Sequence, residues 1–345
     1  YMKRASVFVI LLTILMLIIV EIFAQYSLKS STLSYPLFYN QNSMTIPFLW
    51  EGKHKAYNNI DPLLGWGINS EQIKEHNYST SNNCIVLETG PSDASKLSIY
   101  ISGGSTSDLM YDQENWPKYL LSILEQNNIS AKIYIAAVGG YNSGQELLKT
   151  IRDIDFIQPD IHISYSGANE TEFPSYTSPY EKTFFETTLK KKRTFLPNTI
   201  EVLTQMLGTR NNSIELSEVE VWESHQFWKK NMSAMHQLSS LNNTSFVSIL
   251  QPVKGQNSAL AAFEKYDEKT FHLVEDNKKF YPFAINLAKT HPYIHDFTQI
   301  FSAEATDVFS DDCHIARIKH QEMIGNAVFG LIESIAINKL SDNQE

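Results

Sequence analysis

Short apolar runs with strand character alternate with amphipathic helical segments through the middle of this chain, and this alternation constrains the fold more than any other feature. The predicted strands are residues 84–89, 96–102, 131–138, 160–167 and 245–252. The predicted helices are residues 115–126, 143–154 and 314–338. Strands that alternate with helices favour a parallel sheet with helices packed around it. The sequence therefore predicts an α/β fold.

The N-terminus carries a long uncharged apolar segment behind a basic pair. Lys3 and Arg4 precede residues 5–20, which contain no charge. With the apolar residues that follow, the segment approaches the length that spans a bilayer. We expect an uncleaved signal anchor, a transmembrane helix over residues 1–24, in preference to a cleaved signal peptide. In both cases the rest of the chain is expected outside the cytoplasm, on the periplasmic or extracellular side.

The remainder of the chain is expected to form one principal domain, since 345 residues suffice for a single large core. Residues 25–82 begin with a run rich in Ser, Tyr, Asn, Thr and Pro, which predicts a stalk and N-terminal extension. The last part of this extension, residues 61–69, is expected to pack on the domain. The domain itself is expected over residues 83–340, with a helical insertion at about 177–240.

Charge and cysteine content limit the partners and the covalent chemistry. The net charge is −10, which disfavours a nucleic-acid partner because phosphate binding requires a basic face. Cys84 and Cys313 are the two cysteines of the chain. Outside the cytoplasm they could form a disulfide, and two buried free thiols are an equal alternative.

Four polar segments stand where a ligand would meet the predicted sheet. Three follow predicted strands, and the fourth precedes the last helix: GGSTS (103–107), VGGYNS (138–143), GANE (167–170) and DDCH (311–314). Each segment alone is typical of an ordinary turn. Open parallel sheets bind ligands at the carboxyl ends of their strands, so we expect these segments to meet in one site.

Together the segments contain the side chains that a serine esterase requires. Ser105 offers a hydroxyl nucleophile at a strand end, and His314 offers an imidazole base. Asp311 lies three residues before His314, at the predicted helix start, where one turn would bring both side chains to one side. Gly140 offers an unobstructed backbone N–H and Asn169 a side-chain amide, both suited to an oxyanion. A metal site is less expected, because neighbouring side chains in DDCH do not easily converge on one ion.

In their order and composition these four blocks resemble the motifs of SGNH hydrolases, also called GDSL esterases, over about residues 95–335. The resemblance is to membrane-anchored or secreted bacterial members. It implies a three-layer α/β/α sandwich, and a triad in which Ser105 is the nucleophile, His314 the base and Asp311 its orienting acid. It also implies an oxyanion hole formed by the N–H groups of Ser105 and Gly140 and the side chain of Asn169.

Three positions depart from the family pattern, and one of them is Lys319, which stands where many members have a helix-start Gly after the His. The other two lie beside the implied site residues. Gly104 stands where an Asp usually precedes the serine, and Glu170 stands where an Asp usually follows Asn169. Neither position belongs to the implied triad, so we expect activity to survive both changes.

The expected function is hydrolysis of an ester, an O-acetyl or other small acyl group on an envelope carbohydrate or related substrate. No metal or organic cofactor is expected. Two alternatives stay open: acyl transfer to a glycan by the same triad, and a non-catalytic glycan-binding or assembly protein that keeps the fold.

Overall fold

The computed structural model describes residues 70–91, 95–172, 218–257 and 268–342, and positions 16, 19, 61, 64, 67, 68, 259, 260, 263 and 264. Three predictions fall largely outside these described residues. They are the membrane segment 1–24, the stalk up to residue 60, and residues 177–217 of the helical insertion.

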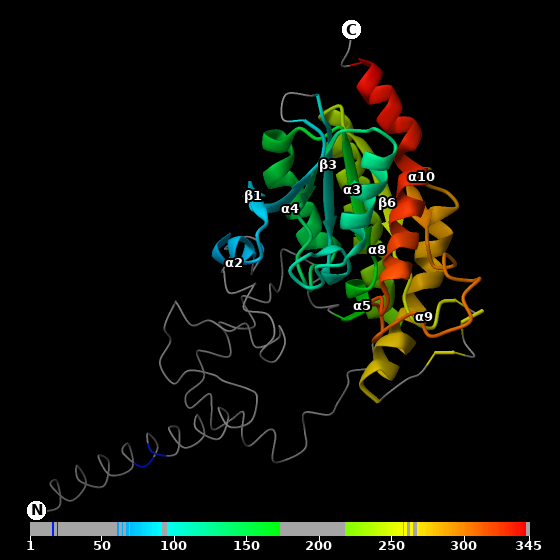
Figure 1. Ribbon diagram of the computed structural model, residues 1–345. Coiled ribbons are helices and arrows are strands. Elements are labelled where there is room, and N and C mark those ends of the chain that lie inside the picture. Colours follow the sequence, from blue (N-terminus) through cyan, green and yellow to red (C-terminus); the bar gives the residue numbers. More distant parts are fainter. Residues whose placement is uncertain are drawn as a thin grey trace, which may run out of the picture.

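A seven-stranded sheet forms the centre of the fold (Figure 1). In spatial order its strands are β1 (Ser79–Ser81), β2 (Cys84–Glu88), β4 (Ala131–Ile135), β3 (Leu97–Gly103), β5 (Ile161–Ser166), β6 (Ser245–Leu250) and β7 (Ile294–Asp296). The five strands from β4 to β7 run parallel to one another. The polar segments that follow β3, β4 and β5 therefore all leave the sheet at the carboxyl ends of these strands, on the same side of the molecule.

The sheet is not parallel throughout, so the prediction of a parallel sheet is wrong at one edge. Strands β1 and β2 form an antiparallel hairpin. Its turn residues Asn82 and Asn83 have φ angles of 49° and 57°, the left-handed conformation of a tight hairpin turn. Strand β2 also runs antiparallel to β4. The connection from β2 to β3 is too short for the crossover helix that a parallel arrangement needs.

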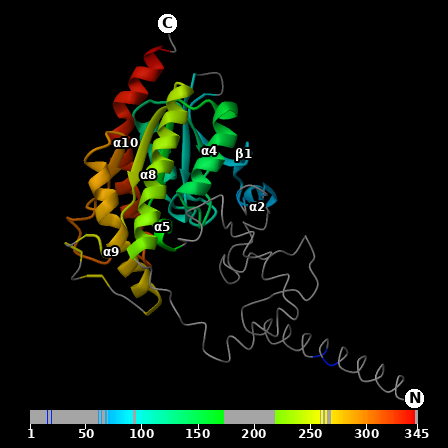
Figure 2. The same cartoon turned by 180° about the vertical axis from the view of Figure 1, so that it is seen from behind.

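Helices cover both faces of the sheet, which gives the three predicted layers (Figures 1 and 2). On one face α3 (Trp116–Gln126) packs against α10 (Ile318–Asp342). The other face carries α4 (Ser143–Ile157), α8 (Glu218–Leu241) and α9 (Glu268–Ala288). Shorter helical segments are α2 (Ser70–Glu75), η3 (Ser105–Ser107) and α5 (Asn169–Glu172).

The two faces of the sheet bury different chemistry, because successive side chains of a strand point to opposite faces. Ile99 and Ile101 of β3 belong to the main hydrophobic cluster, with residues of α3 and α10. The alternate positions are polar: Ser102 of β3 and His162 and Ser164 of β5 are at most 1% exposed, and bond to side chains of α4 and α8. Buried polar groups need hydrogen-bond partners, so this face holds a network.

Among the described residues, one helix is long and apolar enough to cross a membrane by length and composition, Ile318–Ser341 within α10. Its residues Ile324, Val328 and Ile332 are at most 1% exposed and belong to the main hydrophobic cluster. They are four positions apart and form one stripe of the helix, as a core helix requires.

The predicted packing of residues 61–69 on the domain is found at the described positions of this segment. Leu64 and Ile68 are 3% and 5% exposed and belong to the main hydrophobic cluster. Asp61 forms an ion pair with Arg152 of α4. The end of the predicted N-terminal extension is thus part of the folded domain.

Candidate active site

Ser105 is the first residue of η3, two positions after the last residue of strand β3, and is 4% exposed. The preceding residue, Gly104, lies where three segments meet. A Cβ atom at position 104 would stand 2.5 Å from Nδ2 of Asn169 and 3.2 Å from the carbonyl oxygen of Tyr141. There is no space for a side chain here, so an Asp at position 104 would displace Asn169.

His314 and Asp311 complete a hydrogen-bonded line that begins at Ser105. Nε2 of His314 lies 2.7 Å from the Ser105 hydroxyl oxygen, although 209 positions separate the two residues. Nδ1 of His314 lies 2.7 Å from Oδ2 of Asp311. The side chain of His314 is 11% exposed and that of Asp311 is 37% exposed. The structure therefore brings together the three residues of the predicted triad.

The DDCH segment is a turn, and the expectation of a helix start there is wrong. Oδ1 of Asp311 accepts the backbone N–H groups of Cys313 at 3.0 Å and His314 at 2.8 Å. The N–H of Ser310 donates to the carbonyl oxygen of His314 at 2.8 Å. Asp311 thus folds the chain back on itself with one oxygen and holds the imidazole with the other. Helix α10 starts only at Ile318.

Tyr111 covers one face of the imidazole, and sequence analysis did not identify it. Its ring stacks on His314 with centroids 4.2 Å apart and an interplanar angle of 18°. Its hydroxyl lies 3.4 Å from Nδ1 of His314, farther than Asp311. No motif marks Tyr111, and its position soon after Ser105 is the signal that could have pointed to it.

The predicted oxyanion donors lie on the loops that flank Ser105. Gly140 is in the turn between β4 and α4 with a φ of 79°, a left-handed conformation that favours glycine. Asn169 begins α5, and its Nδ2 donates to the carbonyl oxygen of Tyr141 at 2.7 Å. One N–H of this amide holds the side chain in place. The amide has a second N–H that can serve another acceptor.

The two aspartates of the DDCH turn have pKa values that are shifted in opposite directions. Burial raises the pKa of Asp311, but the hydrogen bond and charge of His314, with two backbone N–H groups, outweigh it and lower the pKa to about 2. Burial and the charge of Asp311 raise the pKa of Asp312. Asp311 is therefore ionised across the physiological range and can stabilise an imidazolium.

Two further carboxyl groups, those of Glu146 and Glu170, are buried behind the site, and each residue is 1% exposed. Oε2 of Glu146 accepts the hydroxyls of Ser102 at 3.0 Å and Ser164 at 2.8 Å. Glu170 accepts the backbone N–H of Ser143 at 2.7 Å and its hydroxyl at 2.9 Å. Burial raises the pKa of Glu146 to about 8 and that of Glu170 to about 7, against the opposing effect of these hydrogen bonds.

The raised pKa of Glu146 predicts a pH-dependent stability. In the unfolded chain this carboxyl ionises near its ordinary pKa of about 4.3, whereas in the folded chain it stays protonated up to about pH 8. The contribution of Glu146 to the free energy of unfolding is therefore fully present below its pKa in the unfolded chain. It is lost as pH rises through its pKa in the folded chain. We expect Glu146→Gln to reduce the loss of unfolding free energy between about pH 5 and about pH 9 by a few kcal/mol. Urea unfolding at both pH values measures the free energy of unfolding. Equal decreases from the lower to the higher pH in the wild-type protein and in Glu146→Gln would contradict the prediction.

The ligand atoms of Asp311, Cys313 and His314 lie within 4.8 Å of one another. The expectation that neighbouring DDCH side chains do not converge is therefore wrong for these three. However, Nδ1 of His314 is hydrogen-bonded to Asp311, and Nε2 is hydrogen-bonded to Ser105. A metal ion at His314 would have to replace one of these bonds, so the arrangement suits proton transfer better than metal ligation.

Both cysteines are free and buried, so the disulfide alternative is wrong and the alternative of two free thiols is confirmed. They belong to different hydrophobic clusters. Sγ of Cys313 lies 3.8 Å from Nδ1 of His314. Sγ of Cys84 lies 3.8 Å from Oδ2 of Asp153, and burial raises the pKa of its thiol to about 11.

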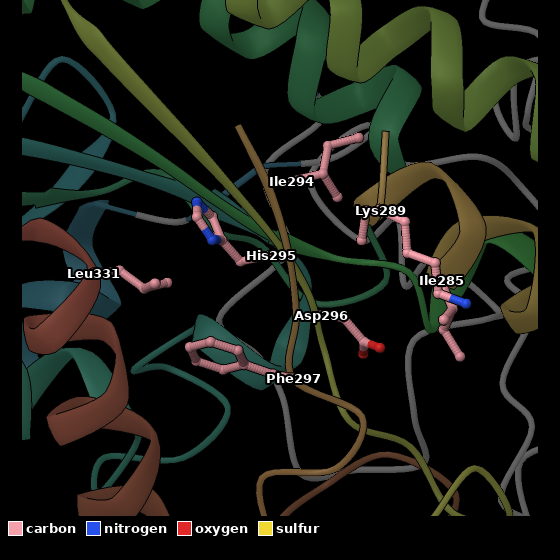
Figure 3. Close-up of a pocket in the computed structure, with 8 residues that line it drawn as sticks. Ile285, Lys289, Ile294, His295, Asp296, Phe297 and Leu331 are labelled. Atoms are coloured by element: carbon pink, nitrogen blue, oxygen red, sulfur yellow. The ribbon is translucent and has the colours of Figure 1, made fainter. Parts of the chain in front are cut away.

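A cavity of about 310 Å³ lies elsewhere, at the β7 edge of the sheet (Figure 3). Its walls come from α9, β7 and α10, and include Ile285, Ile294, His295, Phe297 and Leu331. None of the candidate catalytic side chains lines it. The substrate of a reaction at Ser105 would therefore not occupy this cavity.

No family model matches the chain, and no curated protein matches it. The chain is similar to several solved structures. One is the acetyl xylan esterase AlAXEase, at 11% identity and a TM-score of 0.42, over 68% of this chain and 99% of that one. Another is a GDSL-like lipase from Bacteroides thetaiotaomicron, at 11% identity and a TM-score of 0.41, over 77% of this chain and 98% of that one.

A third similar structure is the esterase EstA from Pseudoalteromonas sp., at 14% identity and a TM-score of 0.38. The match covers 69% of this chain and 98% of that one. Identities and TM-scores this low do not transfer a function, so the chemistry has to come from the residues of this chain.

Proposed function

We propose that this protein is a serine hydrolase of carboxylic esters, with Ser105 as nucleophile, His314 as general base and Asp311 as the acid that orients it. One observation carries the proposal: the line from the Ser105 hydroxyl through both ring nitrogens of His314 to Asp311, with both contacts at 2.7 Å. A nucleophile, a base within hydrogen-bond reach and a third group that orients the base are the parts that covalent acyl transfer needs.

In the proposed acylation step, the Ser105 oxygen attacks the ester carbonyl while Nε2 of His314 takes the hydroxyl proton. Asp311 accepts a hydrogen bond from the N–H at Nδ1 of His314 and stabilises the imidazolium that forms. The carbonyl oxygen gains negative charge, which the N–H groups of Ser105 and Gly140 and the amide of Asn169 would stabilise.

Collapse of the tetrahedral intermediate then expels the alcohol, which takes the proton from His314 and leaves an acyl group on Ser105. In the second half-reaction His314 removes a proton from water, and the resulting attack on the acyl-serine releases the acid and restores the Ser105 hydroxyl. These steps need no metal or organic cofactor.

The proposed substrate is an O-acetyl or other small acyl ester on an envelope carbohydrate, as the motif resemblance to SGNH hydrolases implies. The proposal includes an N-terminal membrane anchor over residues 1–24 and a catalytic domain outside the cytoplasm, because a basic pair precedes the apolar run. A tethered enzyme of this kind meets acylated glycans and small esters rather than nucleic acid.

Purified full-length protein is expected to hydrolyse p-nitrophenyl acetate and to be labelled by a fluorophosphonate on the peptide that contains Ser105. Peptide mapping by mass spectrometry locates the label. Absence of both turnover and label would refute the proposal and favour the non-catalytic binding protein. Acyl transfer to an added oligosaccharide in excess of hydrolysis would instead identify an acyltransferase that uses the same residues.

A further inference from the structure

We infer that Glu170 is a positioning residue for the proposed oxyanion hole, because it ties together the two loops that carry Gly140 and Asn169. The inference rests on the proposed function and adds to it a residue outside the triad.

The two donor loops belong to strands that do not pair with each other. Gly140 follows β4 and Asn169 follows β5, and strand β3, which leads to Ser105, lies between them. Backbone pairing within the sheet therefore does not link the loops directly. A site that stabilises a developing charge needs its donors held to within about 0.5 Å, so some other contact has to fix their separation.

One such contact is the hydrogen bond from Nδ2 of Asn169 to the carbonyl oxygen of Tyr141, and Glu170 supplies a second. It is the neighbour of Asn169, and its two carboxylate oxygens accept the backbone N–H and the hydroxyl of Ser143, at 2.7 and 2.9 Å. Ser143 lies three positions after Gly140 and is the first residue of α4, at the end of the β4–α4 loop. The amide of Asn231 in α8 donates to the same Ser143 hydroxyl at 2.9 Å. One buried carboxyl group thus joins the two loops with two hydrogen bonds, and α8 supports the junction.

A carboxylate suits this position because the start of α4 has backbone N–H groups without helical acceptors. The side chain of Asn142 caps the N–H groups of Gly144 and Gln145, at 3.1 and 3.2 Å. Glu170 accepts the remaining N–H, that of Ser143. A negative charge at a helix N-terminus is favourable, and hydrogen bonds to an ionised acceptor are stronger than neutral ones.

Glu146 offers a matched control. It is buried to the same 1% exposure and is also bonded to serine hydroxyls, but its partners Ser102 and Ser164 lie within strands and not in a donor loop. Glu146→Gln should therefore change stability without moving either donor.

The experiment compares Glu170→Gln with Glu146→Gln, at about pH 8, in p-nitrophenyl acetate kinetics, urea unfolding and crystal structures. Gln keeps the shape of the side chain but replaces one acceptor with a donor. We expect Glu170→Gln to lower kcat about tenfold with KM within about twofold, because the donors act on the transition state. We expect Glu146→Gln to keep kcat within about twofold. If Glu170→Gln does not fold, Ser143→Ala should lower kcat by about threefold, because it removes the hydroxyl contacts with Glu170 and Asn231 and keeps the backbone N–H contact with Glu170.

If the wild-type protein hydrolyses the ester, equal kcat values for Glu170→Gln and Glu146→Gln would overturn the inference. The crystal structures separate it from the proposed function. A shift of about 0.5 Å or more between Gly140 and the Asn169 amide in Glu170→Gln supports the positioning role even if the wild-type protein does not hydrolyse esters. Unmoved loops would overturn it even if Ser105 proves to be the nucleophile.

Discussion

Replacing Ser105 with alanine is expected to lower kcat for p-nitrophenyl acetate by about 10⁴-fold or more, the range seen when a nucleophile is removed from a triad. The hydroxyl oxygen, 2.7 Å from Nε2 of His314, is the atom that would form the acyl-enzyme. Without it, His314 has no nucleophile to activate and only attack by water remains. Steady-state turnover by the purified variant measures the effect, and fluorophosphonate labelling should disappear with it.

Ser107 provides the control for this variant. It lies in the same short helix, is fully buried, and its hydroxyl accepts the indole N–H of Trp116 at 3.0 Å. Ser107→Ala should cost about 1 kcal/mol of stability and leave turnover close to wild type. Unchanged turnover in Ser105→Ala, or equal losses in both variants, would show that Ser105 is not the nucleophile.

Asp311→Asn is expected to lower kcat by about 10³-fold to 10⁴-fold, for a reason that the geometry of the turn supplies. Oδ1 of Asp311 accepts two backbone N–H groups, so an asparagine would place its carbonyl oxygen there. Its NH₂ group would then face Nδ1 of His314, where Oδ2 now lies at 2.7 Å. An N–H donor at Nδ1 favours the tautomer with its proton on Nε2, which cannot accept the Ser105 proton.

The neighbouring residue tests whether this effect is specific. Asp312→Asn removes a carboxyl from the same turn but leaves the contact between Asp311 and His314 in place. We expect kcat within about threefold of wild type for Asp312→Asn, since a charge that touches no reacting group contributes little. Steady-state kinetics of both variants at one pH decides the matter. Comparable decreases in kcat for Asp311→Asn and Asp312→Asn would argue that the negative charge of the turn, and not the orientation of His314, supports the reaction.

Local pattern was enough to predict most of the central elements. The five predicted strands correspond to β2, β3, β4, β5 and β6, because buried strands are short apolar runs. Helix α9 was not predicted as a helix, and it contains Pro282. Strand β7 was missed because it spans only Ile294–Asp296, too short for a pattern to show. The antiparallel hairpin at the edge depends on the turn at Asn82 and Asn83, a signal that the apolar runs do not contain.

The candidate site divides in a similar way. Spacing and residue type picked out Ser105, His314 and Asp311, because proton transfer needs a few particular functional groups. Tyr111 and Glu170 are marked only by contacts with residues far away in the sequence or on another loop, and neither residue type is distinctive by itself. The sequence-based expectation also treated Gly104 as a neutral change, whereas its missing side chain leaves the space that Asn169 occupies.

The sequence by itself determined the α/β class of the fold, the order of its main elements and the chemical groups available for a reaction, since these follow from local periodicity and residue type. Only the tertiary structure decided that Ser105 and His314, 209 positions apart, meet at 2.7 Å, that the two cysteines stay apart, and that DDCH is a turn held by Asp311. The physical reason is that hydrogen bonds and steric fit act over a few ångströms in space. The order of residues along the chain does not encode those distances directly.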